Sequence, residues 1–490
     1  MVLHRYLGIA IGLLMLSWFL TGIVMMYVGF PQPAGGERLR GLPVIAWGEC
    51  CSVDAANVPE GQPVARAEIE MLLGTPVLRL PRVLVPTQTI ELAQGKEKHL
   101  DIDEAKIVAM AAAAPRTGGQ APPLASAEEI DEDQWTLNRY RQEQPIFRFV
   151  FDDPDGSVLY VSGASGRVVL RTTAAQRFWN WLGAIPHWLY FESLRTDGLA
   201  WSRTVIWTSI LGSFLTIIGL YLGIAQFKRG KDGWRSPYRG LFYWHHLAGL
   251  AFGVVTLAFV ASGLVSMNPW GFLDSRGGGE RARLEGPSPR WAEVRESVLE
   301  LRTRSVMAVN LSLAPYGGKL FWLATARDGS VTRLDASGNM AALGERDLLE
   351  AGMRLAGAAG IATQGLIADG DPYYLSARLP VYRVIANDAE STRYYIDPAS
   401  GALWQRADSN RRWHRWLFGA IHRLDFASWI RARPAWDIIL ITLMLGGFAV
   451  SATGVYLALR RVRSDLVMTL RALAALALRR KETAKRMQPS

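Results

Sequence analysis

Four uninterrupted runs of apolar residues stand out along this chain of 490 residues. They lie near residues 6–28, 203–227, 241–267 and 436–459. Each run is long enough to cross the hydrocarbon core of a bilayer as a helix, which takes roughly 20 residues. No small-residue cleavage site follows the first run, so we expect a retained helix rather than a signal peptide. The pattern therefore predicts a membrane protein with four spanning helices.

Between these runs the pattern changes to short apolar stretches bounded by turn residues, which indicates strands. In the first long segment, Asp101 or Asp103 is suited to cap a helix that ends near Ala114. Strands are expected in that segment at 77–80, 83–85, 146–151, 158–161 and 168–170. The second long segment predicts helices at 291–301 and 346–355, with strands at 306–313, 320–324, 331–334, 381–385 and 394–396. The expected fold class is a membrane all-α four-helix bundle with two α+β segments outside it.

The net charge of +10 is informative because of where the basic residues lie. They gather in the loop 228–240 and again from Arg460 onward, beside the ends of apolar runs. The positive-inside rule places that loop and both termini in the cytoplasm, and the two long segments on the outer side. Nucleic-acid binding is excluded as the explanation, since the basic residues flank spans and do not cover a soluble domain. The basic, amphipathic stretch 466–485 is expected to lie along the lipid surface of the membrane.

The chain is therefore expected to have eight parts. In order they are a first transmembrane helix (1–29), a first outer segment (30–200), a second helix (201–227), a basic loop (228–240), a third helix (241–267), a second outer segment (268–435), a fourth helix (436–460) and a basic tail (461–490).

One aromatic stretch occurs twice. The segment 181–191 reappears as 416–426 with Trp, His and Phe at the same spacing, an offset of 235 residues (181 to 416). At the start of the two halves the offset is 241 (4 to 245), and His-x-x-x-Gly occurs at both places. We infer an internal tandem duplication. The glycines that recur in the spans are expected to let the helices approach closely; they are Gly8, Gly12 and Gly22, matched by Gly249, Gly253 and Gly263.

Four of the seven histidines obey this repeat, His4 with His245 and His187 with His422. Ionisable residues at membrane depth are costly and usually serve a function, and imidazoles on facing helices are common axial ligands of haem iron. One pair at each edge of the bundle predicts two haem b groups with two histidine ligands each. His246 is a rival to His245. The alternatives are histidines that anchor helix ends beside Trp and Arg, or a divalent-metal site.

The other sequence features leave alternatives open. His414 is interpreted as interfacial and His99 as solvated. Cys50 and Cys51 permit a vicinal disulfide, a thiol metal site or two unpaired residues. Arg148 and its equivalent Arg383 are either strand residues on a solvated face, the favoured interpretation, or the receptor of an anionic chelate.

Two sets of strand and turn motifs resemble the PepSY module. They are Phe147-Arg148-Phe149, Asp152-Asp153-Pro154-Asp155-Gly156 and Ser165-Gly166 in the first segment, with Tyr382-Arg383-Val384 and Asp397-Pro398-Ala399-Ser400-Gly401 in the second. With the His-x-x-x-Gly spans and the Trp…His…Phe segments, the whole chain resembles the PepSY-associated transmembrane family. That family includes haem-containing ferric-siderophore reductases of the inner membrane. The resemblance implies two periplasmic PepSY-like segments and reductase activity in the bacterial inner membrane.

The expected function is electron transfer to a periplasmic ferric siderophore or other iron chelate, which releases ferrous iron. The sequence holds no dinucleotide fingerprint, P-loop or flavin motif, so the electron donor is expected to be a separate molecule, either quinol or a cytoplasmic reductase. Two other interpretations stay open: a PepSY sensor or scaffold that binds a peptide or a protease without a cofactor, and a metal permease.

Overall fold

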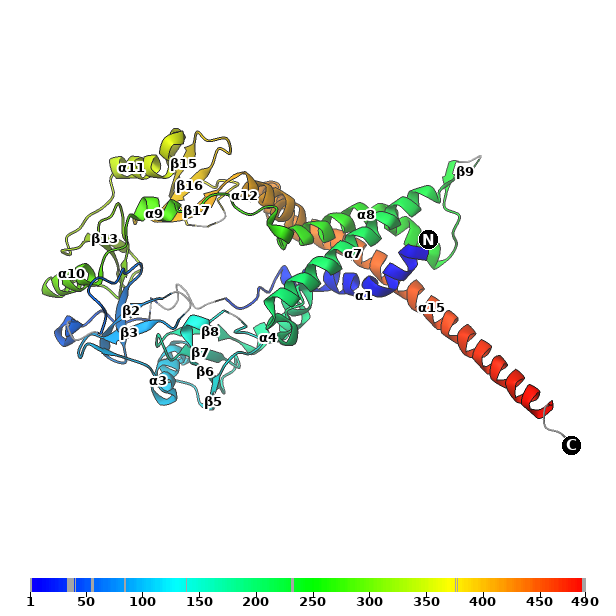
Figure 1. The fold of residues 1–490 in the computed structure, drawn as a ribbon, viewed down its shortest axis with the longest axis horizontal. Helices are drawn as coiled ribbons and strands as arrows, with labels where there is room; N and C mark the ends of the chain where they lie inside the picture. Colours follow the sequence, from blue (N-terminus) through cyan, green and yellow to red (C-terminus); the bar gives the residue numbers. More distant parts are fainter. Residues whose placement is uncertain are drawn as a thin grey trace. The chain divides into compact units, whose positions relative to one another are not determined.

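The computed structural model of the chain describes residues 2–32, 39, 41–53, 57–82, 85–137, 139–230, 233–374, 376 and 378–486 (Figure 1). The chain forms two compact units, each assembled from separate stretches of sequence. The helical unit comprises Met1–Gly29, Trp179–Phe272 and His414–Ser490. The sheet unit comprises Phe30–Phe178 and Leu273–Trp413.

The helical unit is built on four helices long and apolar enough to cross a membrane, as counted over the described residues. They are α1 (Val2–Met25), α7 (Gly198–Ala225), α8 (Leu241–Ser266) and α15 (Ala435–Arg486). α1 packs against α7 and α15, and α8 packs against the same two helices. The four spans predicted from hydropathy are confirmed. Helix α15 continues beyond the expected fourth span, without a break, to Arg486 (Figure 1, red).

Two groups of short helices precede α7 and α15 at equivalent places in the two halves. The first group is α4 (Ala174–Leu182), α5 (Ala184–Trp188) and α6 (Glu192–Arg195). The second group is α12 (Ser409–His414), the π-helix η7 (Arg415–Ala420), α13 (Ile421–Arg423) and α14 (Ser428–Arg431). The loop between α7 and α8 carries a short hairpin, β9 (Lys228–Gly230) and β10 (Gly233–Arg235). Lys231, one of the basic residues expected in this loop, lies outside the described residues.

A seven-stranded sheet in the sheet unit combines strands from both halves of the chain, in the order β13-β12-β11-β1-β2-β3-β4. The strands are β1 (Glu68–Leu72), β2 (Thr75–Leu80), β3 (Gln88–Glu91), β4 (Lys96–Glu97), β11 (Asn310–Leu313), β12 (Phe321–Thr325) and β13 (Val331–Asp335). β1 pairs antiparallel with β11, with Ile69 opposite Leu311. Helix α10 (Trp291–Thr303) buries its apolar face in the core of this sheet. The two long segments between the apolar helices, separate in the sequence, therefore share one sheet.

Two four-stranded antiparallel sheets of the same layout complete the sheet unit; one helix packs on the first sheet and two helices contribute to the core of the second. The first contains β5 (Leu124–Ile130), β6 (Ile146–Phe151), β7 (Val158–Ser162) and β8 (Val168–Thr172) with helix α3 (Ile102–Ala113). The second contains β14 (Ile361–Ile367), β15 (Val381–Ala386), β16 (Arg393–Ile396) and β17 (Leu403–Ala407) with helices α9 (Glu280–Glu285) and α11 (Glu345–Ala356). Asp101 caps α3 in a capping box with Glu104, which confirms the predicted start.

Two sequence features of the segment 30–200 have different outcomes. The strand expected at 83–85 falls mainly on residues 83 and 84, which lie outside the described residues. Cys50 and Cys51 are joined to each other as a disulfide, and Cys50 is buried in the core of the seven-stranded sheet.

Candidate functional site

The four repeated histidines meet as two pairs inside the helical unit. The ring centroids of His4 and His245 lie 6.3 Å apart, and those of His187 and His422 are also 6.3 Å apart. His4 stands at the beginning of α1, whereas His187 contacts Thr21 near the end of the same helix. The 17 residues from position 4 to 21 correspond to about 25 Å of helix. The pairs therefore lie at opposite ends of the bundle; we call them the first pair (His4, His245) and the second pair (His187, His422).

In the second pair, each Nδ1 contacts a hydroxyl group of a spanning helix. His187 Nδ1 lies 3.0 Å from Thr21 Oγ1, and His422 Nδ1 lies 3.0 Å from Ser262 Oγ. Both hydroxyls already donate their hydrogen to a backbone carbonyl, Thr21 to Ser17 and Ser262 to Phe259. A hydroxyl whose hydrogen is committed can only accept, so each imidazole carries its proton on Nδ1.

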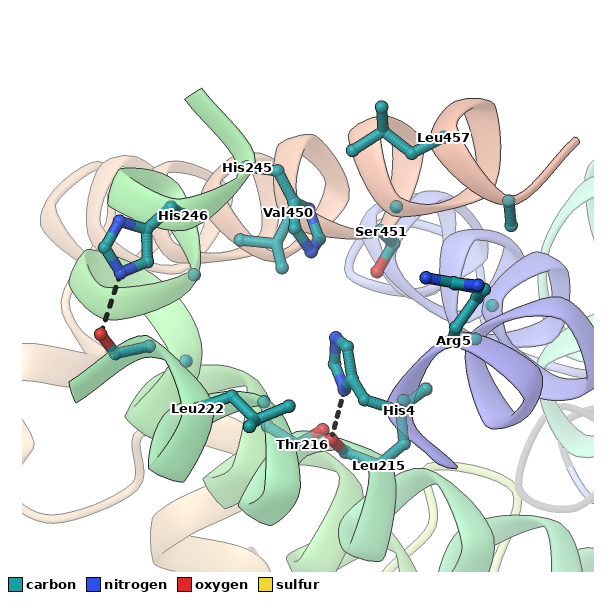
Figure 2. Close-up of a pocket in the computed structure, with 18 of the residues that line it drawn as sticks. His4, Arg5, Leu215, Thr216, Leu222, His245, His246, Val450, Ser451 and Leu457 are labelled. Carbon is teal, nitrogen blue, oxygen red and sulfur yellow. Dashed lines mark hydrogen bonds between the residues drawn. The ribbon is translucent and has the colours of Figure 1, made fainter. Parts of the chain in front are cut away.

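The first pair follows the same rule. His245 Nδ1 lies 3.0 Å from Thr453 Oγ1, which donates its own hydrogen to the Ala449 carbonyl. His4 Nδ1 lies 3.2 Å from the Leu215 carbonyl, which can only accept (Figure 2). All four imidazoles therefore keep the lone pair on Nε2. A histidine that donates from one nitrogen and keeps the other free is oriented and tautomerically fixed for metal ligation.

A glycine on a neighbouring helix packs against each of the four rings. A Cβ at Gly219 would lie 2.8 Å from His4, and one at Gly454 would lie 3.2 Å from His245. At the second pair, a Cβ at Gly22 would lie 3.4 Å from His187 and one at Gly263 would lie 3.6 Å from His422. The absence of a side chain at each facing glycine thus leaves room for the imidazole ring.

A cavity of about 380 Å³ lies beside the first pair, bounded by α1, α7, α8 and α15 (Figure 2). Its volume is within the range of about 300–1,000 Å³ found for ligand sites. Seven glycines contribute to its wall: Gly8, Gly12, Gly219, Gly223, Gly249, Gly253 and Gly454. Helix packing was expected to explain the glycines of the spans, and for Gly12 and Gly253 it does, since they contact Val455 and Leu220.

Gly8 and Gly249 depart from that expectation. A Cβ at either position would meet no atom within 4 Å, so these glycines face the cavity and not a neighbouring helix. Each stands one helical turn after a histidine of the first pair, on the same face of its helix. The His-x-x-x-Gly spacing therefore supplies a ring nitrogen and, directly beside it, a wall without side chains. That combination leaves space for a flat ligand.

The spacing of the pairs suits two ligands on opposite sides of one metal ion. Two imidazoles bound through Nε2, each at about 2 Å from the metal, place their centroids roughly 6 Å apart. Both pairs match this value. No group of three or more His, Cys, Asp or Glu side chains suited to a metal ion occurs among the described residues. Two imidazoles beside a flat-walled space fit a haem, in which the macrocycle supplies the remaining iron ligands.

His246 is engaged elsewhere. Its Nε2 lies 2.7 Å from the Gly223 carbonyl and its Nδ1 lies 2.7 Å from Ser236 Oγ. Figure 2 shows its ring turned from the space between His4 and His245. Of the two adjacent histidines, His245 is therefore the one that faces His4. The remaining two lie apart from both pairs: His99 is exposed beside Glu97, and the ring of His414 contacts Phe418.

The short helices that carry the second pair end in the same way. Leu189 and Leu424, at the ends of α5 and α13, both adopt the left-handed conformation with φ of 53°. The carbonyl just before each leucine accepts a bond of 2.8 Å from an indole N–H, that of Trp201 in α7 and that of Trp436 in α15. These two tryptophans, which are separated by the same offset of 235 residues as the aromatic stretches, therefore attach the two histidine-bearing turns to the spanning helices.

Arg148 and Arg383 of the sheet unit are each paired with acidic side chains. Arg148 contacts Glu128 and lies 3.7 Å from Asp133, and Arg383 donates to Asp371 at 2.7 Å. The same aspartates accept hydrogen bonds from Tyr160 and Tyr395. Burial, with the adjacent carboxylate, raises the pKa of both tyrosines above the usual value. These Tyr–Asp–Arg groups, which sequence reasoning missed, hold the loops before β6 and β15. The two arginines are therefore half-buried members of ion pairs and not strand residues on a solvated face.

Comparison with known proteins identifies one family. The family model described as the PepSY-associated TM region matches residues 1–461. No curated protein matches the chain.

Proposed function

Because the chain belongs to the PepSY-associated TM family and has four helices long enough to span a membrane, we propose that it is a di-haem electron-transfer protein of the bacterial inner membrane. His4 and His245 would hold one haem b, and His187 and His422 the other. The substrate would be a periplasmic ferric siderophore or similar iron chelate. In this proposal the two halves descend from a tandem duplication, which accounts for two similar sites.

The observation that carries the proposal is the matched geometry of the two pairs. Each has a centroid separation of 6.3 Å, Nδ1 contacts that leave Nε2 free, and glycines against the rings. Histidines that only anchored helix ends at the lipid interface would need none of these features. When bound, haem supplies a reversible one-electron change between ferric and ferrous iron.

The residues of the chain would fix and shield both sites. The hydroxyls and the Leu215 carbonyl orient the imidazoles, and strong contacts of this kind tune a metal centre through its ligands. The positive-inside rule places the basic loop 228–240, and with it the first pair, on the cytoplasmic side, and the second pair on the periplasmic side. Electrons would then enter from quinol or a cytoplasmic reductase and leave toward the chelate. Ferrous iron binds such chelates weakly, so reduction of the chelated ferric iron would release the metal.

The direct test is the absorption spectrum of the protein purified from haem-replete cells. We expect a Soret band, sharp visible bands on reduction, and two haems per chain by pyridine haemochrome assay. A colourless protein would overturn the proposal and favour a PepSY scaffold that binds a peptide or protease. Bound divalent metal without haem would favour a permease.

A second experiment tests the order of the two sites. In His245→Ala the second-pair haem should still be reduced by dithionite and reoxidised by a ferric chelate, but it should no longer accept electrons from the physiological donor. In His187→Ala the first-pair haem should accept donor electrons and fail to pass them on. Stopped-flow spectra would report both steps. Donor-driven chelate reduction at the parental rate in both variants would exclude transfer through the two sites in series.

A further inference from the structure

The cavity beside the first pair has an unbalanced charge. Two arginines, Arg5 and Arg461, line it, and no aspartate or glutamate does. Arg5 directly follows His4, and Figure 2 shows its guanidinium beside Ser451 at one end of the space between the two imidazoles. Arg5 is exposed in the first turns of α1, and Arg461 lies on α15 beyond the apolar run, so both guanidinium groups stand at one end of the cavity with no carboxylate in its wall. The lining therefore suits a ligand with an anionic edge.

The partners of the two arginines leave this charge largely uncompensated. Arg5 forms no ion pair with any residue that the structure describes. Arg461 pairs with Asp465, one turn further along α15, at 3.0 Å. Both members of that pair are about half exposed, with side-chain exposures of 47% and 42%, and such a pair contributes little to stability. The guanidinium of Arg461 is thus able to exchange this partner for a buried anion.

The two arginines also break the similarity between the halves. At the offset of 241, Arg5 corresponds to His246, and at the offset of 235, Arg461 corresponds to Gln226. His246 uses both ring nitrogens within the protein, and Gln226 is not part of the cavity wall. A cavity with histidines and glycines at equivalent places therefore has guanidinium groups on the α1 and α15 side alone.

We propose that Arg5 and Arg461 bind the two propionate carboxylates of the haem held by His4 and His245, and so determine which way round the macrocycle lies. This rests on the proposed function. Two guanidinium groups match two carboxylates in charge, and Arg–carboxylate contacts are charge-assisted and often bidentate. The positive charge beside the iron also favours the added electron, so it raises the reduction potential of this haem relative to a site without the arginines.

The test uses the full chain with Arg5→Gln, Arg461→Gln and the double variant, with Arg463→Gln as the matched control. Arg463 is exposed on the same helix and does not line the cavity. The readouts are the transfer of haem to apomyoglobin and the midpoint potential from a spectral redox titration. We expect the double variant to release its first-pair haem at least about tenfold faster, as loss of charge-assisted bonds predicts, and to show a lower potential. The variant with both Arg5→Lys and Arg461→Lys keeps the positive charge but lacks the bidentate geometry of arginine. It should therefore restore the midpoint potential of the first-pair haem more fully than it restores the retention of that haem.

The haem of the second pair serves as an internal check of folding in every variant. The double Gln variant could contain both haems, release the first-pair haem at the parental rate and show the parental midpoint potential. That result would overturn the proposal and leave the proposed function intact. Absence of haem from the parental protein would instead overturn the proposed function itself. Loss of both haems in the Gln variants would indicate misfolding, and the Lys variants would then decide: retained haem with a parental potential supports the charge interaction, and haem lost there as well opposes it.

Discussion

His187 and His422 face each other with ring centroids 6.3 Å apart, although neither residue belongs to a spanning helix. Each sits on a short turn fixed on two sides, by a hydroxyl of α1 or α8 at Nδ1 and by an indole of α7 or α15 at the following carbonyl. All four spanning helices thus contribute to the position of this pair. Substitutions on the spans are therefore expected to affect these rings without touching them.

The histidine pairs predict separate losses of haem. His422→Ala should reduce the content from two haems to one and leave the other low-spin, because the first pair is about 25 Å away along the bundle. His4→Ala should remove the other haem in the same way. The measurement is pyridine haemochrome content with the visible spectrum.

Two histidines serve as controls for this series. His99→Ala changes an exposed residue of the sheet unit, and His246→Gln changes a ring that faces the Gly223 carbonyl. Both variants should keep two low-spin haems. A loss of haem in His246→Gln equal to that in His245→Ala would contradict the assignment of His245 to the first pair.

The glycines of the first pair predict loss of haem without loss of folding. Gly249→Leu adds a side chain where no atom lies within 4 Å, so the helix should still fold while the cavity is filled. The first-pair haem should fall to near zero and the second-pair haem should remain. Gly365→Leu, at another open glycine but in β14 of the sheet unit, is the control and should keep both. Full haem content in Gly249→Leu would show that the cavity is not the binding site.

The charge distribution predicts the topology. A reporter inserted next to Arg239 should behave as cytoplasmic, and one inserted near Gly338 as periplasmic, because basic residues favour the cytoplasmic side. Alkaline phosphatase and green fluorescent protein fusions give opposite signals on the two sides. The reverse pattern would invert the proposed direction of electron flow.

Asp371 predicts a pH dependence of stability in the sheet unit. Burial alone would raise the pKa of this carboxyl group, but hydrogen bonds from the Tyr373 N–H, Arg383 and Tyr395 hold it below the usual value of 3.8. A carboxyl group whose pKa is lowered in the folded state stabilises the fold at pH values above its unfolded pKa. This contribution is lost as the pH falls through the lowered pKa of the folded state. Asp371→Asn should therefore lower the free energy of unfolding by about 1–3 kcal/mol at pH 7.

The difference between the parental protein and Asp371→Asn should begin to narrow as the pH falls below about 3.8, where the unfolded chain binds a proton at this carboxyl group, and it should disappear as the pH falls through the lowered pKa of the folded protein. Thermal unfolding of the whole chain in detergent, followed by fluorescence across pH, would measure it. Asp369→Asn, at an exposed position two residues earlier, should behave as the parental protein. A constant difference across the pH range would show that ionisation of Asp371 does not contribute.

The sequence predicted the spans and many of the buried strands because their hydrophobic periodicity is strong, but it missed β1 and β3, which are short and largely buried. Strand β6 was predicted with its observed bounds. Strands β5 and β14 were missed, because they are edge strands whose residues are mostly exposed and give no apolar alternation. The pairing of β1 with β11 was missed as well, since no local pattern specifies a partner in the other half of the chain.

The candidate site was partly predictable for a similar reason. The repeat singled out His4, His187, His245 and His422, and the structure brings them together in the expected pairs. The hydroxyls of Thr21, Ser262 and Thr453 were not singled out, because serine and threonine are common in membrane helices and only the fold shows which of them reach an imidazole. The cavity glycines were interpreted as packing residues for the same reason, as spacing alone does not distinguish a helix contact from an empty wall.

The pairing of β1 with β11 has a consequence for biosynthesis. Glu68 and Ile69 emerge from the ribosome long before their partners Ser312 and Leu311, and two spanning helices are made in between. Until then β1 is an open edge that can pair with other chains. The first half cannot complete its largest sheet while it is being made, so this protein matures only after translation has delivered the second half.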